Sequence, residues 1–164
     1  VNNAGINRDR MFASMTEQEW DAIMAVHLKG HFCISSHAVH YWRGQSKEGK
    51  PVDARIINTT SGAGLQGSIG QSNYAAAKAG VATMAVTWAR EFARYGIRCA
   101  AIAPGFIATD MVASMKPEAL EKMTAGIPLR RLGTPEEIAH TARFILENDY
   151  ITGRVIETDG GIRL

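Results

Sequence analysis

The sequence predicts an α/β protein with one parallel β-sheet, because short β-rich runs alternate with helical segments along its length. From the N-terminus the predicted order is strand, helix, strand, helix, strand, helix, strand. This alternation is typical of parallel strands joined by right-handed crossovers. The 164 residues are 46% hydrophobic and 21% charged, which fits a single domain, residues 1–164, with a hydrophobic core.

The first helix is predicted by a capping box at Thr16–Glu19, in which the threonine and glutamate side chains each pair with a free backbone amide. Apolar residues follow at helical spacing. We expect Gly30 to interrupt this helix and a second helical stretch to run to about Trp42. The polar segment from Gly44 to Asp53 predicts an exposed loop.

The middle of the chain predicts two strands around a long helix. Arg55–Thr59 is β-rich and leads into a glycine-rich loop. A helix is expected from about Ser72 to Tyr95, with Gly96 as its C-cap and small residues on more than one face. Ile97 to Ala103 predicts a buried strand that ends at Pro104.

The last part of the chain predicts one more helix and strand. A capping box at Thr134–Glu137, with proline at the first helical position, predicts a helix to about Leu146. Val155 to Thr158 predicts the last strand. At the other end, Val1 to Gly5 resembles the end of a strand, and we therefore expect the chain to be a piece of a longer protein.

Charge and composition exclude several classes of function. The net charge is +2 and basic residues are scattered among acidic ones, so we expect neither nucleic-acid nor membrane binding. The longest weakly polar run, Ala79 to Ala89, is shorter than the ~20 residues that span a bilayer. Cys33 and Cys99 are isolated in apolar surroundings, which favours a reducing, cytoplasmic location.

The most informative pattern is formed by Tyr74, Lys78 and Ser61. A free tyrosine has a pKa of about 10 and is a poor acid or base at neutral pH. Tyr74 and Lys78 have i,i+4 spacing on one predicted helix, so we expect the ammonium to lower the pKa of the phenol by up to ~3 before desolvation is subtracted. Ser61, in a preceding loop, would hold the oxygen of a carbonyl or alcohol. The three predict proton exchange with a C–O group.

Several motifs occur in one order along the whole chain: Asn2-Asn3-Ala4-Gly5, Ser61, Tyr74-x-x-x-Lys78, Pro104-Gly105-Phe106-Ile107-Ala108-Thr109, Leu132-Gly133-Thr134-Pro135-Glu136-Glu137-Ile138-Ala139 and Asp159-Gly160-Gly161. In these motifs the chain resembles the C-terminal two-thirds of a short-chain dehydrogenase/reductase, of the type that includes bacterial 3-oxoacyl-(acyl-carrier-protein) reductases. The resemblance implies a Rossmann-like, doubly wound parallel sheet. It also implies NAD or NADP as cofactor and a small-molecule carbonyl or alcohol as substrate.

The resemblance implies a role for each site residue. Tyr74 is implied as the proton donor or acceptor, Lys78 as the group that lowers the phenol pKa and bonds the nicotinamide ribose, and Ser61 as the group that orients the substrate oxygen. Cofactor contacts are implied for Asn3, Ala4, Gly5, Tyr74, Lys78, Pro104, Gly105, Ile107 and Thr109.

One catalytic position departs from the family pattern. The family's fourth catalytic residue, usually asparagine, is His27 here, in the context Val26-His27-Leu28-Lys29-Gly30. Histidine titrates near neutral pH and would still carry protons to bulk water, so we count His27 among the catalytic residues. His27 and His31 have i,i+4 spacing, but no third ligand lies near them in the sequence, and we expect no metal site.

The family's phosphate-binding glycine motif does not occur in this sequence, and neither does the residue that selects NAD or NADP. A complete domain of this kind has roughly 250 residues, so roughly 85 lie outside the sequence. Gly62–Gly67 spells G-x-G-x-x-G, but the next predicted helix begins several residues later and no suitable acid follows ~20 residues on. We interpret Gly62–Gly67 as a flexible loop beside the active site.

Two functions of different classes follow. The first is an NAD(P)-dependent oxidoreductase acting on a 3-oxoacyl or 3-hydroxyacyl thioester or a similar substrate, formed as a homodimer or homotetramer partly through the helix from Ser72 to Tyr95. The second is a truncated, non-catalytic family member that acts as an interaction module. An intact mass near 17.8 kDa would favour the second function.

Overall fold

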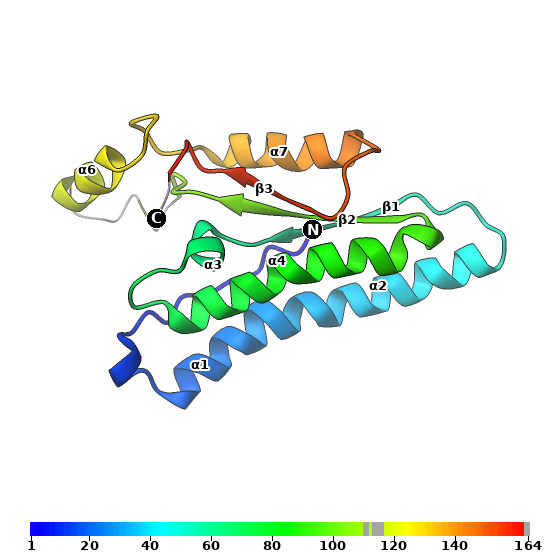
Figure 1. Cartoon of the computed structure of the whole chain (residues 1–164), viewed down its shortest axis with the longest axis horizontal. Coiled ribbons are helices and arrows are strands. Elements are labelled where there is room, and N and C mark those ends of the chain that lie inside the picture. Colours follow the sequence, from blue (N-terminus) through cyan, green and yellow to red (C-terminus); the bar gives the residue numbers. More distant parts are fainter. Residues whose placement is uncertain (110–111, 113–116, 163–164) are drawn as a thin grey trace.

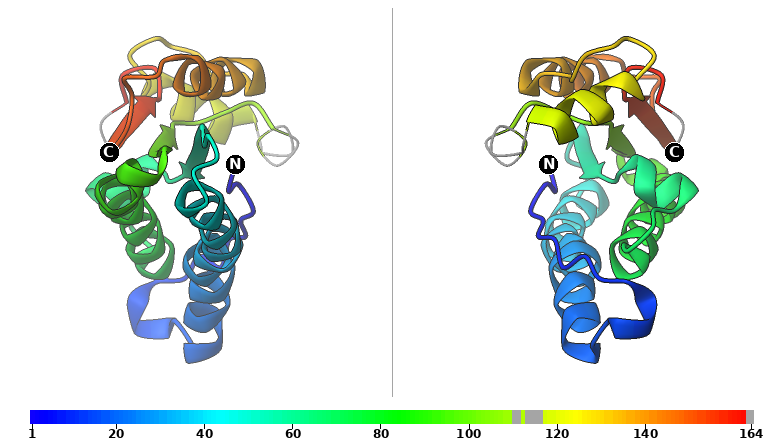
Figure 2. Two further views of the ribbon diagram at one scale, coloured as in Figure 1. Left: turned by 90° about the vertical axis from the view of Figure 1, so that its right-hand side faces the viewer. Right: turned by 90° about the vertical axis from the view of Figure 1, so that its left-hand side faces the viewer.

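In the computed structural model, residues 1–109, 112 and 117–162 are described. They form three layers, with a β-sheet between two sets of helices (Figure 1). Helices α4 (Ser72–Phe92) and α2 (Gly30–Lys47) cover one face of the sheet, and α7 (Pro135–Glu147) covers the other. The end-on views in Figure 2 show the same separation of the layers. The layered α/β architecture confirms the predicted fold class.

The sheet has three parallel strands in the order β1 (Ala54–Thr59), β2 (Ile97–Pro104) and β3 (Arg154–Thr158). The N-terminal segment joins the outer side of β1 through a single parallel bridge between Asn2 and Asn58. Parallel pairing brings the carboxyl ends of the strands to one edge of the sheet, which is where ligands bind in open α/β sheets.

The N-terminal helices follow the first capping box. Thr16 and Glu19 form both bonds of the box, at 3.2 and 2.9 Å, and α1 runs over Glu17–Ile23. The expected interruption at Gly30 is wrong. A π-helical stretch, η2 (Met24–Lys29), joins α1 to α2, and the Gly30 amide bonds the carbonyl of Ala25, so the helical hydrogen bonding continues through the glycine. Helix α2 then extends to Lys47, beyond the predicted end.

The glycine-rich segment after β1 is a short helix, α3 (Gly62–Gln66), and not a flexible loop. A Cβ at Gly64 would lie 2.6 Å from Cβ of Lys78. Only glycine therefore lets α3 pack this closely on α4. The structure corrects our interpretation of this segment from a loop to a packed support for Lys78.

The long central helix ends as predicted. Helix α4 is followed by the 3-10 turn η3 (Ala93–Tyr95), and Gly96 has a φ of 75°, the left-handed conformation of a glycine C-cap. The sequence analysis did not predict two short elements, η1 (Phe12–Ser14) and α6 (Pro117–Ala125).

The core has two parts, one on each face of the sheet. Successive residues of a strand point to opposite faces, so Ile56 packs toward α2 and α4 while Ile57 packs toward Ile145 of α7. None of the helices in the described part of the chain is long and apolar enough to cross a membrane.

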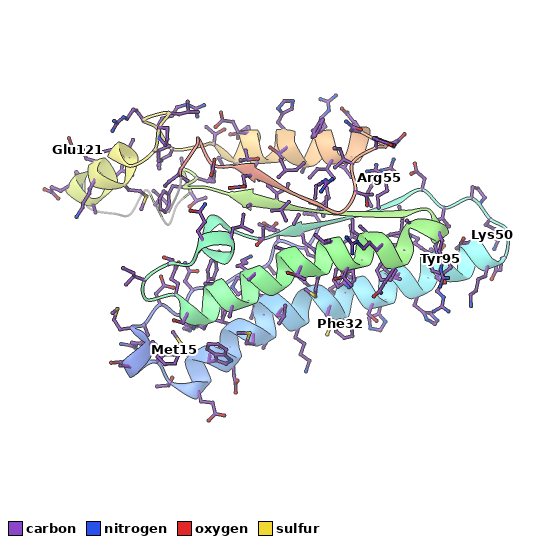
Figure 3. The ribbon with its side chains drawn as sticks, viewed as in Figure 1. Met15, Phe32, Lys50, Arg55, Tyr95 and Glu121 are labelled. Atoms are coloured by element: carbon purple, nitrogen blue, oxygen red, sulfur yellow. The ribbon has the colours of Figure 1, made fainter. Side chains whose placement is uncertain are left out.

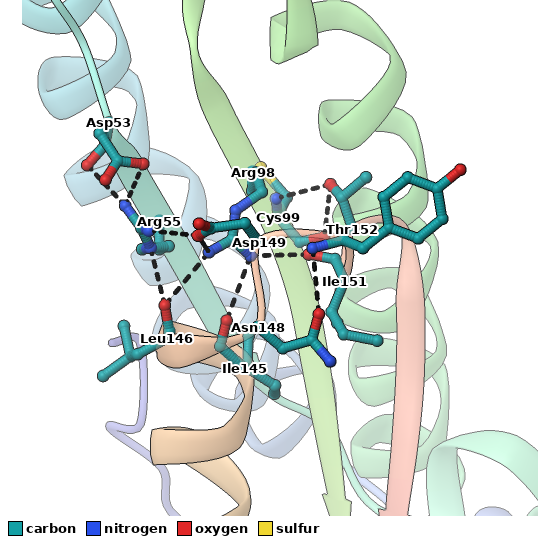
Figure 4. A network of polar contacts seen from close by, with 11 residues as sticks. Asp53, Arg55, Arg98, Cys99, Ile145, Leu146, Asn148, Asp149, Ile151 and Thr152 are labelled. Carbon is teal, nitrogen blue, oxygen red and sulfur yellow. Dashed lines mark hydrogen bonds and ion pairs between the residues drawn. The ribbon is translucent and has the colours of Figure 1, made fainter.

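An arginine network fastens the end of α7 to the sheet (Figure 4). Arg98 of β2 donates to the carbonyls of Ile145, Leu146 and Ile151 at 2.8 to 3.2 Å. Asp149 accepts from Arg55 at 2.8 Å and from Arg98 at 3.4 Å. The two guanidinium groups thus satisfy carbonyls that a helix C-terminus leaves free.

Candidate active site

A cavity of about 360 Å³ opens where the carboxyl ends of β1 and β2 meet the segment that follows Asn2. The cavity brings together all four residues predicted to be catalytic and most of those predicted to bind the cofactor. The predicted residues that line it are Asn3, Gly5, His27, Ser61, Tyr74, Lys78, Pro104, Gly105 and Thr109.

Ser61 and Tyr74 lie on neighbouring elements that follow β1. Ser61 is the N-cap of α3, and its Oγ accepts from the amide of Ala63 at 3.3 Å. Ser61 and Tyr74 line the same cavity, and the Ser61 side chain acts to lower the pKa of the Tyr74 phenol. The hydroxyl groups of the two side chains therefore both face the cavity. This arrangement allows both of them to hydrogen-bond the same substrate oxygen.

The effect of Lys78 on Tyr74 differs from our expectation. Burial raises the pKa of the Tyr74 phenol; the Ser61 side chain acts in the opposite direction, and the charge of Asp9 raises the pKa further. The Lys78 Nζ donates to the carbonyl of Thr59 at 2.6 Å and lies over the Tyr74 ring, 5.6 Å from its centre. The ammonium faces the ring, and desolvation of the phenolate sets the direction of the shift in the phenol pKa.

Lys78 is itself perturbed by burial. Lys78 is only 3% exposed, and burial lowers the pKa of its ammonium to about 8. At neutral pH most of the amine still carries a proton. The Lys78 ammonium therefore places a positive charge in the cavity, and contacts with α3 and Thr59 fix its position.

His27 lines the cavity from the π-helical stretch. Its ring lies edge-on to Tyr74, with the ring centres 5.1 Å apart. Its Nε2 lies 3.1 Å from the amide of Ile6 and 2.7 Å from the Ile6 carbonyl. A Cβ at Gly5 would lie 2.7 Å from the His27 ring, so glycine is required for this packing. Burial lowers the pKa of His27, and the neutral imidazole is favoured.

The second histidine, His31, is buried as well but is not among the residues that line this cavity. It is 2% exposed, and burial lowers its pKa to about 4. Within residues 1–109, 112 and 117–162, no group of three or more His, Cys, Asp or Glu side chains is placed to hold a metal ion.

The donor set of the cavity fits the nicotinamide half of a dinucleotide. Asn3, Thr109 and Lys78 contribute an amide, a hydroxyl and an ammonium, which match the ribose hydroxyls and carboxamide of that group. Two predicted cofactor residues lie elsewhere. Ile107 lines a neighbouring cavity of about 500 Å³ with Gly133, and Ala4 is exposed between Asn3 and Gly5.

A second cavity of about 250 Å³ shares Ser61 and Tyr74 with the first and continues past them to Gln71, Phe106 and Ile162. Its mixed polar and apolar lining suits the part of a substrate that extends from the reacting carbon. The sequence analysis assigned none of these three residues to the site, although Phe106 lies within the Pro104–Thr109 motif.

The fold and the site define a Rossmann-like α/β protein whose serine, tyrosine and lysine converge at the carboxyl edge of the sheet. The chain belongs to the short-chain dehydrogenase/reductase family. Residues 1–163 match the family model described as enoyl-(acyl carrier protein) reductase.

Individual relatives agree with this assignment. The chain is 44% identical over 164 residues to a 3-oxoacyl-(acyl-carrier-protein) reductase of Thermotoga maritima, with 99% of the chain and 64% of that protein covered. It is 43% identical to a (3R)-3-hydroxyacyl-CoA dehydrogenase of Rattus norvegicus, with 99% and 61% covered.

Among solved structures, a short-chain dehydrogenase from Mycobacterium avium superposes with a TM-score of 0.78 at 48% identity, over 98% of this chain and 50% of that one. The chain thus spans 61 to 64% of the length of the two relatives named above.

Proposed function

We propose that the protein is an NAD(P)-dependent oxidoreductase that interconverts a carbonyl and a secondary alcohol. The observation that supports this most directly is the convergence of Ser61, Tyr74 and Lys78 on one cavity, with His27 against the tyrosine ring. A bound nicotinamide would supply a hydride at its C4. Asn3, Lys78, Gly105 and Thr109 would hold it.

The chain's own residues would manage the oxygen of the substrate. The Ser61 hydroxyl donates to the carbonyl oxygen and orients it. Tyr74 then transfers its proton to that oxygen, and the Lys78 charge stabilises the phenolate that remains. Because burial raises the pKa of Tyr74, the phenol is protonated near neutral pH, which is the state that carbonyl reduction requires.

The substrate class follows from the relatives and the second cavity. Both named relatives act, by their names, on 3-oxoacyl or 3-hydroxyacyl thioesters. The cavity that extends from Tyr74 toward Phe106 and Ile162 offers room for the part of such a substrate beyond its reacting carbon. We therefore propose a 3-oxoacyl or 3-hydroxyacyl thioester, with NAD or NADP as the cofactor.

We also propose a homodimer or homotetramer, built partly on α4, in a cytoplasmic location. Phe32 of α2 is 55% exposed on the helical layer that α4 shares (Figure 3), and Trp88 and Phe92 of α4 line a groove with it. A second copy would cover these aromatic groups. Light scattering at micromolar concentration tests this, and a monomer would contradict it.

The activity is tested with protein expressed from the complete reading frame. We expect oxidation of NADH or NADPH that depends on an added 3-oxoacyl thioester, followed by the fall in nicotinamide absorbance. Protein that binds neither cofactor and consumes none with any 3-oxoacyl thioester would support the interaction-module alternative and overturn the proposed function.

A further inference from the structure

Asn73 lies directly before Tyr74 and is fully buried, although no step of the proposed reaction uses it. We propose that Asn73 is a positioning residue that fixes Tyr74 relative to the wall of the reaction cavity. This inference rests on the proposed function.

The Asn73 side chain joins three separate segments of the chain. Its Nδ2 donates to the carbonyl of Arg8 at 3.1 Å and to the carbonyl of Glu19 at 3.3 Å. Its Oδ1 accepts from the amide of Tyr74 at 2.8 Å. Both amide hydrogens and the oxygen are therefore used. A buried amide paired in this way favours one arrangement, because any displacement leaves a polar group unpaired in the interior.

One of the three segments is part of the cavity. Residues 6–10, called here the wall segment, line the cavity through Ile6 and Asn7. At its start, the backbone of Ile6 contacts the ring of His27. The wall segment thus extends from the histidine beside Tyr74 to the carbonyl that Asn73 bonds.

The end of the wall segment is tied to the start of α4 by two further bonds. Gln71 Nε2 donates to the Asp9 carboxylate at 2.9 Å, and the Arg10 amide donates to the carbonyl of Gly70 at 2.8 Å. These bonds are at the surface, whereas those of Asn73 are inside. Asn73 therefore provides the buried part of the connection between the wall segment and α4.

The geometry of the helix start makes Tyr74 depend on this connection. The Tyr74 amide is among the donors that the first turn of a helix leaves free. The N-cap residue Gln71 directs its side chain to Asp9 rather than to these amides, and Asn73 Oδ1 accepts from Tyr74 instead. Loss of the Asn73 side chain would release the Tyr74 amide and the wall segment together.

The test is Asn73→Ala in protein from the complete reading frame. We expect kcat to fall about 10²-fold, the effect of misplacing a catalytic group by about 1 Å, with a much smaller change in KM. The pKa that governs kcat should also move. Tyr74 is faced by Lys78 from α4, His27 from η2 and Asp9 from the wall segment, and its distances to these groups would change.

A second variant keeps the test informative if Asn73→Ala folds poorly. Gln71→Ala removes the hydrogen bond to Asp9 at a partly exposed position and shortens one side chain that lines the second cavity. We expect it to leave the melting temperature nearly unchanged and to lower kcat by a smaller factor. Wild-type kcat in both variants would overturn the inference.

The matched control is Ile145→Val, which removes one buried methylene from α7 on the other face of the sheet. We expect a lower melting temperature with wild-type kcat and pH profile. If Asn73→Ala lowers kcat without moving the pH profile, or if Ile145→Val lowers kcat equally, the role of Asn73 is only structural and the inference fails. If Tyr74→Phe keeps its turnover, the proposed function fails instead.

Discussion

At the scale of single residues, burial moves the pKa values of Tyr74 and Lys78 in opposite directions. The pKa of the phenol rises above its ordinary value, and the pKa of the amine falls to about 8. Near neutral pH the pair therefore consists of a neutral phenol and an ammonium. This combination provides a proton for a carbonyl oxygen and a charge for the phenolate that forms.

The Lys78 pKa leads to a prediction on stability. Its ordinary value is 10.5 and its folded value is about 8, so between these pH values the unfolded chain binds more protons than the folded one. Stability should therefore rise with pH in this window. From pH 7 to about 9.5 the free energy of unfolding should rise by about 2 kcal/mol more in the wild type than in Lys78→Met.

The measurement is urea unfolding of both proteins at several pH values. The window ends near pH 10, because the raised pKa of Tyr74 makes stability fall as pH rises further. Parallel curves for wild type and Lys78→Met would show that the amine is not desolvated in the folded protein.

The sequence predicts which residues meet at the site but not how they perturb one another. The i,i+4 spacing places Tyr74 and Lys78 on one helix, as observed. The direction of the phenol pKa depends instead on burial, on Ser61 and on the charge of Asp9. Those contacts join distant segments, and no local pattern contains them. The same holds for the contacts of Asn73.

At the scale of elements, local signals located the helix ends. The capping boxes at Thr16 and Thr134 form with both hydrogen bonds, and Gly96 adopts its left-handed conformation, because such motifs involve residues within one turn. The helix does not break at Gly30 as we expected, because the π-helical stretch continues the helical hydrogen bonding through this residue. That stretch carries His27, in keeping with the frequent use of π-bulges at functional sites.

The arginine network gives a prediction for the α7 layer. Arg98→Leu should lower the free energy of unfolding by about 2–3 kcal/mol, because the carbonyls of Ile145, Leu146 and Ile151 lose a charged donor. The control is Arg143→Leu, which removes an exposed i,i+4 ion pair with Glu147 and should have little measurable effect. Equal midpoints in urea for Arg98→Leu and wild type would contradict this role.

At the scale of the whole molecule, the order of elements predicted the parallel α/β fold. The parallel pairing and the edge with convergent carboxyl ends follow from this alternation. Of the four strands predicted, the first is only a single bridge between Asn2 and Asn58. The packing of α3 on α4 and the bonds between the wall segment and α4 could not be predicted, since both depend on contacts across the fold. These are the contacts that shape the cavity.

The central claim is that the Tyr74 hydroxyl transfers the proton in a nicotinamide-dependent reaction. The most direct test is single-turnover reduction of a 3-oxoacyl thioester by wild type and Tyr74→Phe, in protein from the complete reading frame. We predict that the rate constant of Tyr74→Phe is about 10²–10⁴-fold lower than that of the wild type. The melting temperature should change only by the small amount that the loss of one hydroxyl causes, and the cofactor affinity should not change. A Tyr74→Phe rate constant within a factor of a few of wild type would contradict the account.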